Sequence, residues 1–571
     1  MKLNKYIMTL AGAAMIASCS NFLDETAQGI ISSEQLNTAE TVDQMCNAAY
    51  STLGNVIWSK PTASLWYVGS VRSGDAYKGG GGAADCGQIH QYEMYTTNTV
   101  DNSYTNNLWV EYYNKISRVN EALHRLNGLT TADMPLRDQR IGEMKFLRGH
   151  YYFDLKILYK FVPFIDENVT GDDYNSISNR DLTNQELWDK IAQDFRDAAN
   201  ALPASQVDKG RPNKYAAKAY LAKTLLYQAY IQGDDSNAVT GIDKAKLEEV
   251  NNLCQEVISS GDYDLFADYG DNFLEATENG VESIFAIQFS QNDGTKYGRV
   301  DMDHALNYPM SPSYGCCGFH MASANLINAF KTQNGLPYAE YNKENVAESM
   351  AFDTNTFDPR LDHTVGIPGH PYKYENTHVY DKSWSRDPGN YGYFSSMKEM
   401  QSPNDGSFVR VSPYVASSKN IDLLRYDDVI LFKAEALIEL EREKDALPLI
   451  NQIRERAAKS YSRLIKDGKT YSNYNVAKYV DGVNCNWTQD FAREALRFER
   501  RLEFAMEGNR FFDLVRWGIA AEYLNNYLAV EKDRAKYLKD AKFTKNRDEY
   551  LPIPLNQINY SKGLYKQNVG W

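Results

Sequence analysis

Apolar side chains recur every three or four positions over several long stretches of this chain, which is the spacing of one face of an α-helix. The clearest stretch covers 185–202 and ends where Pro203 forbids its continuation. A second begins near Pro212 and carries many alanines, which permit close helix packing. The same pattern predicts further helices at about 34–51, 108–126, 137–159, 244–260, 425–441 and 445–457.

The predicted helices form pairs. Those at 185–202 and about 212–230 are separated by a short connection, so we expect a helical hairpin, and 425–441 with 445–457 repeats this plan. Paired helices of this length with small residues between them are typical of the ~34-residue tetratricopeptide unit. The pattern therefore predicts a mainly α protein with a tetratricopeptide-like helical-hairpin scaffold.

Two long regions lack this periodicity. Residues 62–101 are rich in Gly, Tyr, Ser and Asp and include four glycines at 79–82, so we expect a long ordered loop region. No Gly-Lys-Ser/Thr follows the glycines, which argues against a phosphate-binding loop. Residues 282–290 alternate as one β-strand would, and the chain is then loop-rich to about 420. Loops this long usually carry function.

The N-terminal residues contain the parts of a lipoprotein signal peptide in their usual order. Lys2 and Lys5 precede an apolar run over 6–16, and small residues then lead to Cys19. The run is shorter than the ~20 residues that span a bilayer. We therefore predict that 1–18 is a cleaved signal peptide and that Cys19 is the lipidation site. The alternative is an N-terminal helix in which this thiol has no role.

The charge of the chain limits its partners. Removal of 1–18 takes away two lysines and no acidic residue, so the formal net charge changes from −14 to −16. The basic residues are dispersed among carboxylates rather than gathered in a stripe, which argues against nucleic acid as a partner. Tyrosine is abundant, with 41 Tyr against 23 Phe and 8 Trp, which indicates a binding surface as well as cores.

The spacing of the cysteines indicates no disulfide framework. The six after Cys19 are scattered and include no CxxC pair for a metal or a redox reaction. Cys316 and Cys317 are adjacent. A disulfide between them would close a strained vicinal ring. We favour the alternative interpretation, in which they are simply two small residues that fill a turn.

We predict no metal and no cofactor. His363, His370 and His378 are spaced by seven and eight residues, unlike the compact HExxH pattern, so we interpret them as loop histidines. Structural calcium near Asp301 and Asp303 is conceivable, but no ligand pattern indicates it.

Segment 499–518, ERRLEFAMEGNRFFDLVRWG, resembles the most characteristic motif of the SusD/RagB family of surface glycan-binding lipoproteins. CSNFLDE, from Cys19, is similar to the acylated terminus of that family. Physically, we expect segment 499–518 to be scaffold, in which apolar side chains pack and charged ones form ion pairs. Further segments resemble the family in the same order: GEMKFLRGHYYFDLKILYKFVPF, RPNKYAAKAYLAKTLLY, ESIFAIQFS, FDPRLD, LLRYDDVILFKAEALIEL, INQIRERA and YLPIPLNQIN.

The resemblance implies a tetratricopeptide-like helical scaffold with a loop-rich, little-β face that binds ligand. It implies a lipid-anchored protein on the surface of the outer membrane, where it would act as a lid on a SusC-like TonB-dependent transporter. The lid would bind an oligosaccharide without catalysis and deliver it for import. The family regions would be 19–275, with the tetratricopeptide-like helices, and 276–571, which is loop-rich over 290–420 and then helical over 421–520.

Three other functions are compatible with the sequence. The same lid could capture peptides or other nutrients. A glycoside hydrolase would need two carboxylates about 5 to 10 Å apart, for which the sequence has no local signature. A tetratricopeptide scaffold that binds only proteins would have a groove-lining helix face and no affinity for sugars.

Sugar binding needs flat apolar faces for C–H groups and polar partners for hydroxyls, and both loop regions contain such residues. Asp75, in its Ser-Gly-Asp context, is similar to a ligand-binding loop of the family. Buried packing would explain the loop aromatics equally well. The candidate glycan-binding residues are Trp66, Tyr67, Asp75, Tyr77 and Tyr92 in the first region, and Tyr308, Tyr314, His320, Tyr372, Tyr374, Trp384, Arg386 and Tyr391 in the second.

Overall fold

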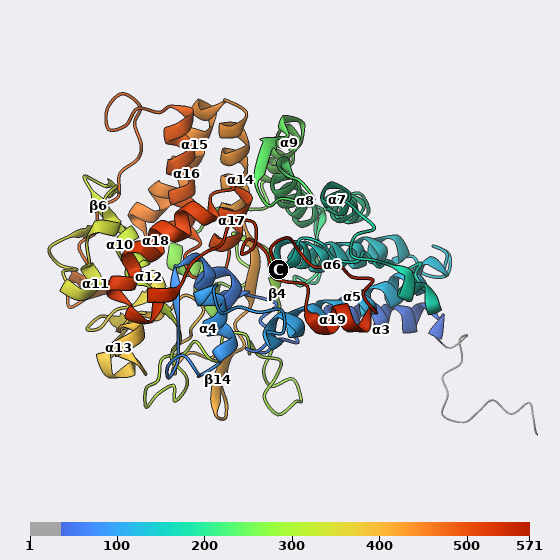
Figure 1. The fold of residues 1–571 in the computed structure, drawn as a ribbon, viewed down its shortest axis with the longest axis horizontal. Helices are drawn as coiled ribbons and strands as arrows, with labels where there is room; N and C mark the ends of the chain where they lie inside the picture. Colours follow the sequence, from blue (N-terminus) through green and yellow to red (C-terminus); the bar gives the residue numbers. More distant parts are fainter. Residues whose placement is uncertain (1–35) are drawn as a thin grey trace, which may run out of the picture.

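The computed structural model describes residues 36–571, so the predicted signal peptide and Cys19 lie outside the described residues. Helices dominate and the sheets are small, which confirms the mainly α prediction (Figure 1). Within 36–571 no helix combines the length and apolar character needed to cross a bilayer.

The first half of the chain is a succession of antiparallel helices, from blue to green in Figure 1. From α5 to α9 each helix packs against the next, as the hairpin prediction requires. The predicted boundaries hold to within a few residues, except that α3 begins five residues later and α5 five residues earlier than predicted. The helices are α3 (Ala39–Tyr50), α5 (Ser103–Asn127), α6 (Arg137–Tyr159), α7 (Asn184–Ala201), α8 (Lys214–Ala229) and α9 (Lys244–Ser259).

Helix α7 shows why the ends of these helices could be predicted from the sequence. Thr183 and Glu186 form a capping box that satisfies backbone N–H groups at its start. At its end Leu202 is already extended, because Pro203 follows. Local chemistry fixes both ends of this helix.

A second helical group follows in the last third of the chain, and α14 joins it to the first by packing against α9. Both hairpin helices predicted here are present as α14 and α15. The group consists of α14 (Tyr426–Glu439), α15 (Glu443–Lys459), α16 (Gln489–Glu503), α17 (Arg510–Arg516) and α18 (Ala520–Arg534). Helix α19 (Leu555–Tyr560) follows and packs against α5 of the first group.

The loop-rich side is organised by a four-stranded sheet in the order β1-β5-β12-β9. It consists of β1 (Ala76–Gly79), β5 (Phe319–Ala322), β12 (Ser395–Ser396) and β9 (Val365–Gly366). In it Tyr77 is paired with Met321, so the two loop regions of the sequence lie side by side. The interpretation of 62–101 as loop alone is wrong, because this region contains β1 and helix α4 (Gly87–Met94).

The strand predicted over 282–290 is present as β4 (Ser283–Ile287), paired with β15 (Ile421–Arg425). Between them the chain forms only short elements. Besides β5, β9 and β12 of the four-stranded sheet, these are α10 (Ala324–Ala329), α11 (Val346–Ser349), α12 (Arg360–Thr364), α13 (Pro388–Tyr391), β6 (Lys331–Gln333), β7 (Leu336–Pro337), β8 (Thr356–Phe357), β10 (Pro371–Tyr372), β11 (Glu375–Val379), β13 (Phe408–Val411) and β14 (Tyr414–Ser417). Two further hairpins pair β2 (Tyr230–Gln232) with β3 (Val239–Ile242) and β16 (Ile465–Lys466) with β17 (Lys469–Thr470).

Segment 499–518 is buried scaffold, as expected. The guanidinium group of Arg360 lies 2.7 Å from Asp358, 2.7 Å from Glu499 and 2.6 Å from Glu503, and these side chains are essentially inaccessible to solvent. Arg456 pairs with Glu503 and also with Glu282. Guanidinium groups therefore neutralise the carboxylates of this interior.

The C-terminal segment returns to the first helical group, and Figure 1 places the chain end beside α6. The side chain of Asn568 donates hydrogen bonds to the carbonyls of Tyr159 and Leu551, at 2.7 and 2.9 Å. The backbone N–H of Leu551 donates to the carbonyl of Leu158 at 2.8 Å. The end of α6 is thus capped by residues about 400 positions later in the chain.

Candidate functional site

Most of the predicted glycan-binding side chains are buried in this structure. Trp66 packs on His320 with ring centroids 5.2 Å apart, and Asp75 accepts a hydrogen bond from Arg501 at 2.9 Å. Such side chains have almost no surface for a sugar. The buried candidates, each at most 5% exposed, are Trp66, Tyr67, Asp75, Tyr77, Tyr92, Tyr308, Tyr314, His320, Tyr372 and Tyr391.

The other candidates retain accessible surface. Trp384 is half-buried against a small aromatic cluster that includes Tyr314 and Tyr372, and Arg386 is exposed. Tyr374 is half-buried, and its hydroxyl lies 2.9 Å from Nδ1 of His363. Trp384, Arg386 and the buried Tyr391 come from one segment, so the structure brings these three predicted residues near α13.

The three histidines lie in separate environments. Nε2 of His363 is 2.7 Å from the carbonyl of Ser460, and Nδ1 of His370 is 2.6 Å from Asp362. The ring of His378 packs near Trp384. The interpretation as loop histidines is wrong for His363 and His378, because short-range backbone pairing places them in α12 and β11.

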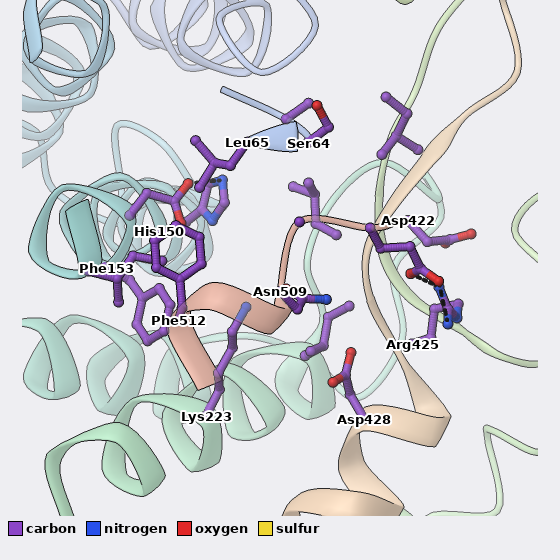
Figure 2. A pocket seen from close by; sticks show the side chains of 18 of the residues that line it. Ser64, Leu65, His150, Phe153, Lys223, Asp422, Arg425, Asp428, Asn509 and Phe512 are labelled. Carbon is purple, nitrogen blue, oxygen red and sulfur yellow. Dashed lines mark hydrogen bonds and ion pairs between the residues drawn. The ribbon is translucent and has the colours of Figure 1, made fainter. Parts of the chain in front are cut away.

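An interior pocket lies between α6, α8 and the start of α14, as Figure 2 shows. Lys223 and Asp428 lie near its wall, and burial raises the pKa of Asp154 to about 6 and lowers the pKa of His150 to about 3. Its volume is about 70 Å³, whereas ligand sites usually measure about 300 to 1,000 Å³. The pocket has room for a few water molecules but not for a sugar.

Asp301 and His304 form a buried ion pair near this pocket, with Nδ1 of His304 2.7 Å from the carboxylate. Burial alone would lower the pKa of His304, but Asp301 raises it to about 9. Asp303 accepts hydrogen bonds from the backbone of Ala63 and Ser64, and burial together with Asp301 raises its pKa to about 7. The carboxylates considered for calcium are therefore engaged within the protein.

The His304 pair predicts a pH dependence of stability. The folded-state pKa of His304 lies above its unfolded value of about 6.5, so its stabilisation is present below pH 6.5 and is lost as the pH rises through 9. We expect the free energy of unfolding, measured by urea denaturation, to fall by at most about 3 kcal/mol over this range. His304→Asn should flatten the decline above pH 8, where Asp303, with a pKa of about 7, is almost fully ionised and no longer contributes.

His150→Asn is the matched control, because His150 is neutral in the folded protein above pH 7. It should leave the slope between pH 7 and 9.5 unchanged. An equal slope in wild type and His304→Asn would show that this ion pair does not link stability to pH.

A groove of about 490 Å³ opens on the loop-rich side, within the size range of ligand sites. Half-buried Tyr393 and the buried Tyr391 supply its aromatic wall. We call it the Tyr393 groove, and it is lined by Tyr77, Ala322, Ala324, Asn345, Ala347, Glu348, Pro388, Gly389, Asn390, Tyr391, Gly392, Tyr393, Phe394, Asp533, Arg534 and Ala535.

Hydrogen bonds position the polar groups of the Tyr393 groove. Arg534 donates to Glu531 at 2.9 Å and to the backbone carbonyl of Asn342 at 2.7 Å. The side-chain amide of Asn345 donates to Glu348 at 3.0 Å. Groups held in this way lose little conformational entropy when a ligand binds.

The sequence did not single out Tyr393 or the amides of the groove. Tyr393 follows Tyr391 by two residues, and Gly392 between them ends α13 with a φ of 68°. That glycine turns the backbone, so the two tyrosines have different exposures. The Asn-Tyr-Gly-Tyr sequence was the available signal.

Cys316 and Cys317 are joined by a disulfide, so the interpretation as turn-filling residues without a bond is wrong. The sequence could not decide this, because adjacency alone does not report whether the two sulfurs face each other. Cys317 is 3% exposed and Cys316 is half-buried. Together with the ion pair of Arg386 and Asp85 at 2.8 Å and the glycines at 80–82, they form what we call the disulfide patch.

Comparisons with known proteins agree with this architecture. A family model described as the SusD family matches residues 281–571, and one described as starch-binding associating with outer membrane matches residues 21–226. SusD-like protein P38 of Formosa agariphila is 25% identical over 539 residues, covering 92% of this chain and 93% of the relative.

Solved structures share the fold. A SusD-like protein from Bacteroides fragilis has a TM-score of 0.71 at 20% identity, covering 95% of this chain and 99% of its own. A protein named laminarin binding SusD-like protein has a TM-score of 0.65 at 22% identity, covering 94% and 100%. Since the SusD family model matches more than half of the residues, the chain belongs to the SusD/RagB family.

Proposed function

We propose that this protein binds an oligosaccharide on its loop-rich side without cleaving it. The observation that carries the proposal is the Tyr393 groove, which combines an aromatic wall with fixed amide, carboxylate and guanidinium groups. Aromatic faces accept the C–H groups of sugar rings, and the polar groups match sugar hydroxyls. A structural neighbour is named for laminarin binding, which supports a glycan as the ligand.

The groove is suited to binding rather than to hydrolysis. A glycosidase acid needs a carboxyl group whose pKa is raised by an apolar environment. Glu348 and Asp533, the carboxylates of the groove, are both exposed, and Asn345 already donates to Glu348. We therefore assign no catalytic residue.

We further propose that the protein is a lipoprotein, anchored through Cys19 on the outside of the outer membrane, where it delivers its ligand to a SusC-like TonB-dependent transporter. Membership of the family supports this proposal, as does the match of residues 21–226 to a family described as starch-binding and associating with the outer membrane. Tethering raises the effective concentration of the binder at the transporter, so modest affinity is sufficient.

The test is calorimetry and affinity electrophoresis with starch, laminarin, fructan, mannan and xylan. We expect one polymer to bind with a Kd between about 0.1 and 1 mM and no reducing ends to be released. Tyr393→Ala should raise that Kd about fivefold to tenfold, because the stacking of one aromatic ring contributes about 1 kcal/mol.

Tyr560→Ala is the matched control, since Tyr560 is 80% exposed on α19, outside the groove. It should bind like the wild type. Unchanged affinity of Tyr393→Ala would place the site elsewhere on the molecule. Absence of binding to all five polymers would overturn the glycan proposal and favour peptide capture.

A further inference from the structure

The Cys316–Cys317 disulfide is held firmly in place by backbone hydrogen bonds. The N–H groups of Cys317 and Gly318 both donate to the carbonyl of Tyr308, at 3.1 and 2.8 Å. On the other side, Arg386 donates to the carbonyl of Cys317 at 3.2 Å. The bonded sulfurs therefore occupy a fixed position on the loop-rich side, and Cys316 remains partly accessible.

The run of four glycines at 79–82 borders this disulfide. The sequence indicated no role for these glycines. A Cβ added to Gly80 would lie 2.5 Å from the ring of Phe319, and one added to Gly81 would lie 2.9 Å from Arg386. Only residues without a side chain allow the backbone to approach so closely. The loop is closed by Lys78, whose ammonium group donates to the carbonyls of Gly79, Gly82 and Asp85.

The disulfide patch also contains hydrogen-bonding groups that face solvent. The side chains of Arg386 and Asp85 are 34% and 30% exposed, and Asp85 also accepts from the N–H of Gly81 at 2.9 Å. A guanidinium group has five donors and a carboxylate has about four acceptor sites, so each retains capacity for a ligand. Their charges cancel, which suits a neutral ligand better than an anionic one.

We propose that the accessible side of Cys316, held in the Cys316–Cys317 disulfide, is a contact surface for the sugar, on which the C–H face of one ring packs while Arg386 and Asp85 bind its hydroxyls. This inference rests on the proposed glycan-binding function and adds a second contact point to it. Divalent sulfur is polarizable, and a disulfide has no N–H or O–H donor, so it offers an apolar face.

The disulfide patch and the Tyr393 groove adjoin the same short helix. Arg386 precedes α13 by two residues, and the residues of α13 line the groove. A Cβ on Gly82 would lie 3.7 Å from the carboxylate of Asp387, which links the glycine loop to the start of that helix. An oligosaccharide of a few units that lies along α13 would contact both surfaces.

A role in ligand binding is distinguishable from a role in stability. Chain-entropy stabilisation by a disulfide grows with the length of the loop that it closes. A bond between adjacent residues closes the shortest possible loop. Its removal should therefore change the melting temperature little, whereas the accessible surface of Cys316 changes from disulfide sulfur to a hydroxyl.

The experiment is calorimetry on the full chain carrying C316S and C317S together, with starch, laminarin, fructan, mannan and xylan as probes. We expect the Kd for the polymer that the wild type binds to rise at least fivefold, with the melting temperature within about 2 °C of the wild type. Dithiothreitol should weaken binding by the wild type to the same extent and leave the double variant unaffected.

Cys485→Ser, which removes a half-buried free thiol outside the disulfide patch, is the control and should bind normally. Wild-type affinity in the double variant would overturn the inference about the disulfide. The proposed function would still stand in that case if Tyr393→Ala weakened binding. Failure of the wild type to bind any of the five polymers would overturn both.

Discussion

Replacement of Arg360 by methionine is expected to lower the free energy of unfolding by about 3 to 5 kcal/mol. The substitution leaves Asp358 and two glutamates of segment 499–518 without the guanidinium group that lies within 2.7 Å of each. Asp358 is then left unpaired, whereas Glu499 keeps only Arg454 and Glu503 keeps only Arg456. An unpaired carboxylate in a fully buried site is strongly destabilising. Because whole proteins are stable by only about 5 to 15 kcal/mol, the variant should accumulate poorly.

The measurement is guanidinium chloride denaturation of wild type and Arg360→Met. Arg125→Met is the control, since Arg125 pairs with Glu121 at the surface, where the glutamate side chain is 52% exposed. Exposed pairs contribute about 0 to 1 kcal/mol, so the control should unfold almost like the wild type. Loss of under 1 kcal/mol in Arg360→Met would show that the buried carboxylates are satisfied by their remaining partners.

Replacement of Gly69 by alanine should be at least as damaging, with an expected loss of about 4 kcal/mol or more. A Cβ at this position would lie 1.8 Å from the carbonyl oxygen of Gly508 and 2.6 Å from its Cα. Both atoms are backbone, so no side-chain rotation relieves the overlap. The short helix at Tyr67–Val71 would therefore have to move away from segment 499–518, which contains Gly508.

Thermal unfolding and the yield of folded protein measure this effect. Gly87→Ala is the matched control, because a Cβ there meets no atom within 4 Å at the start of α4. It should melt at or slightly above the wild-type temperature, since alanine is the better helix former. A folded Gly69→Ala protein with wild-type stability would contradict the close backbone contact seen here.

The helices could be predicted from the sequence because their signals are local. Helix α6 begins and ends at the predicted residues, and α9 differs by one residue at its end. The strand β1 was missed, because its pairing with β5 joins residues more than 240 positions apart. Periodicity within a window cannot report such a partner.

The candidate site was less predictable than the fold, because exposure depends on distant neighbours. The sequence around Tyr77 predicted a loop, yet its hydroxyl donates a hydrogen bond to Glu531 and its strand β1 is paired with β5. Tyr393 has the same chemistry and remains half-exposed in a groove built partly by α18. Aromatic content therefore indicated the loop-rich side, which we propose as the ligand face, without separating core from surface.

The capping of α6 by Asn568 has a consequence for the order in which the chain folds. The carbonyl of Tyr159 obtains its side-chain partner only when residue 568, 409 positions later, is available. Contacts this distant in sequence carry a large loop-closure cost and form late. We therefore expect the C-terminal end of α6 to gain its full set of hydrogen bonds only after the segment around Asn568 has docked.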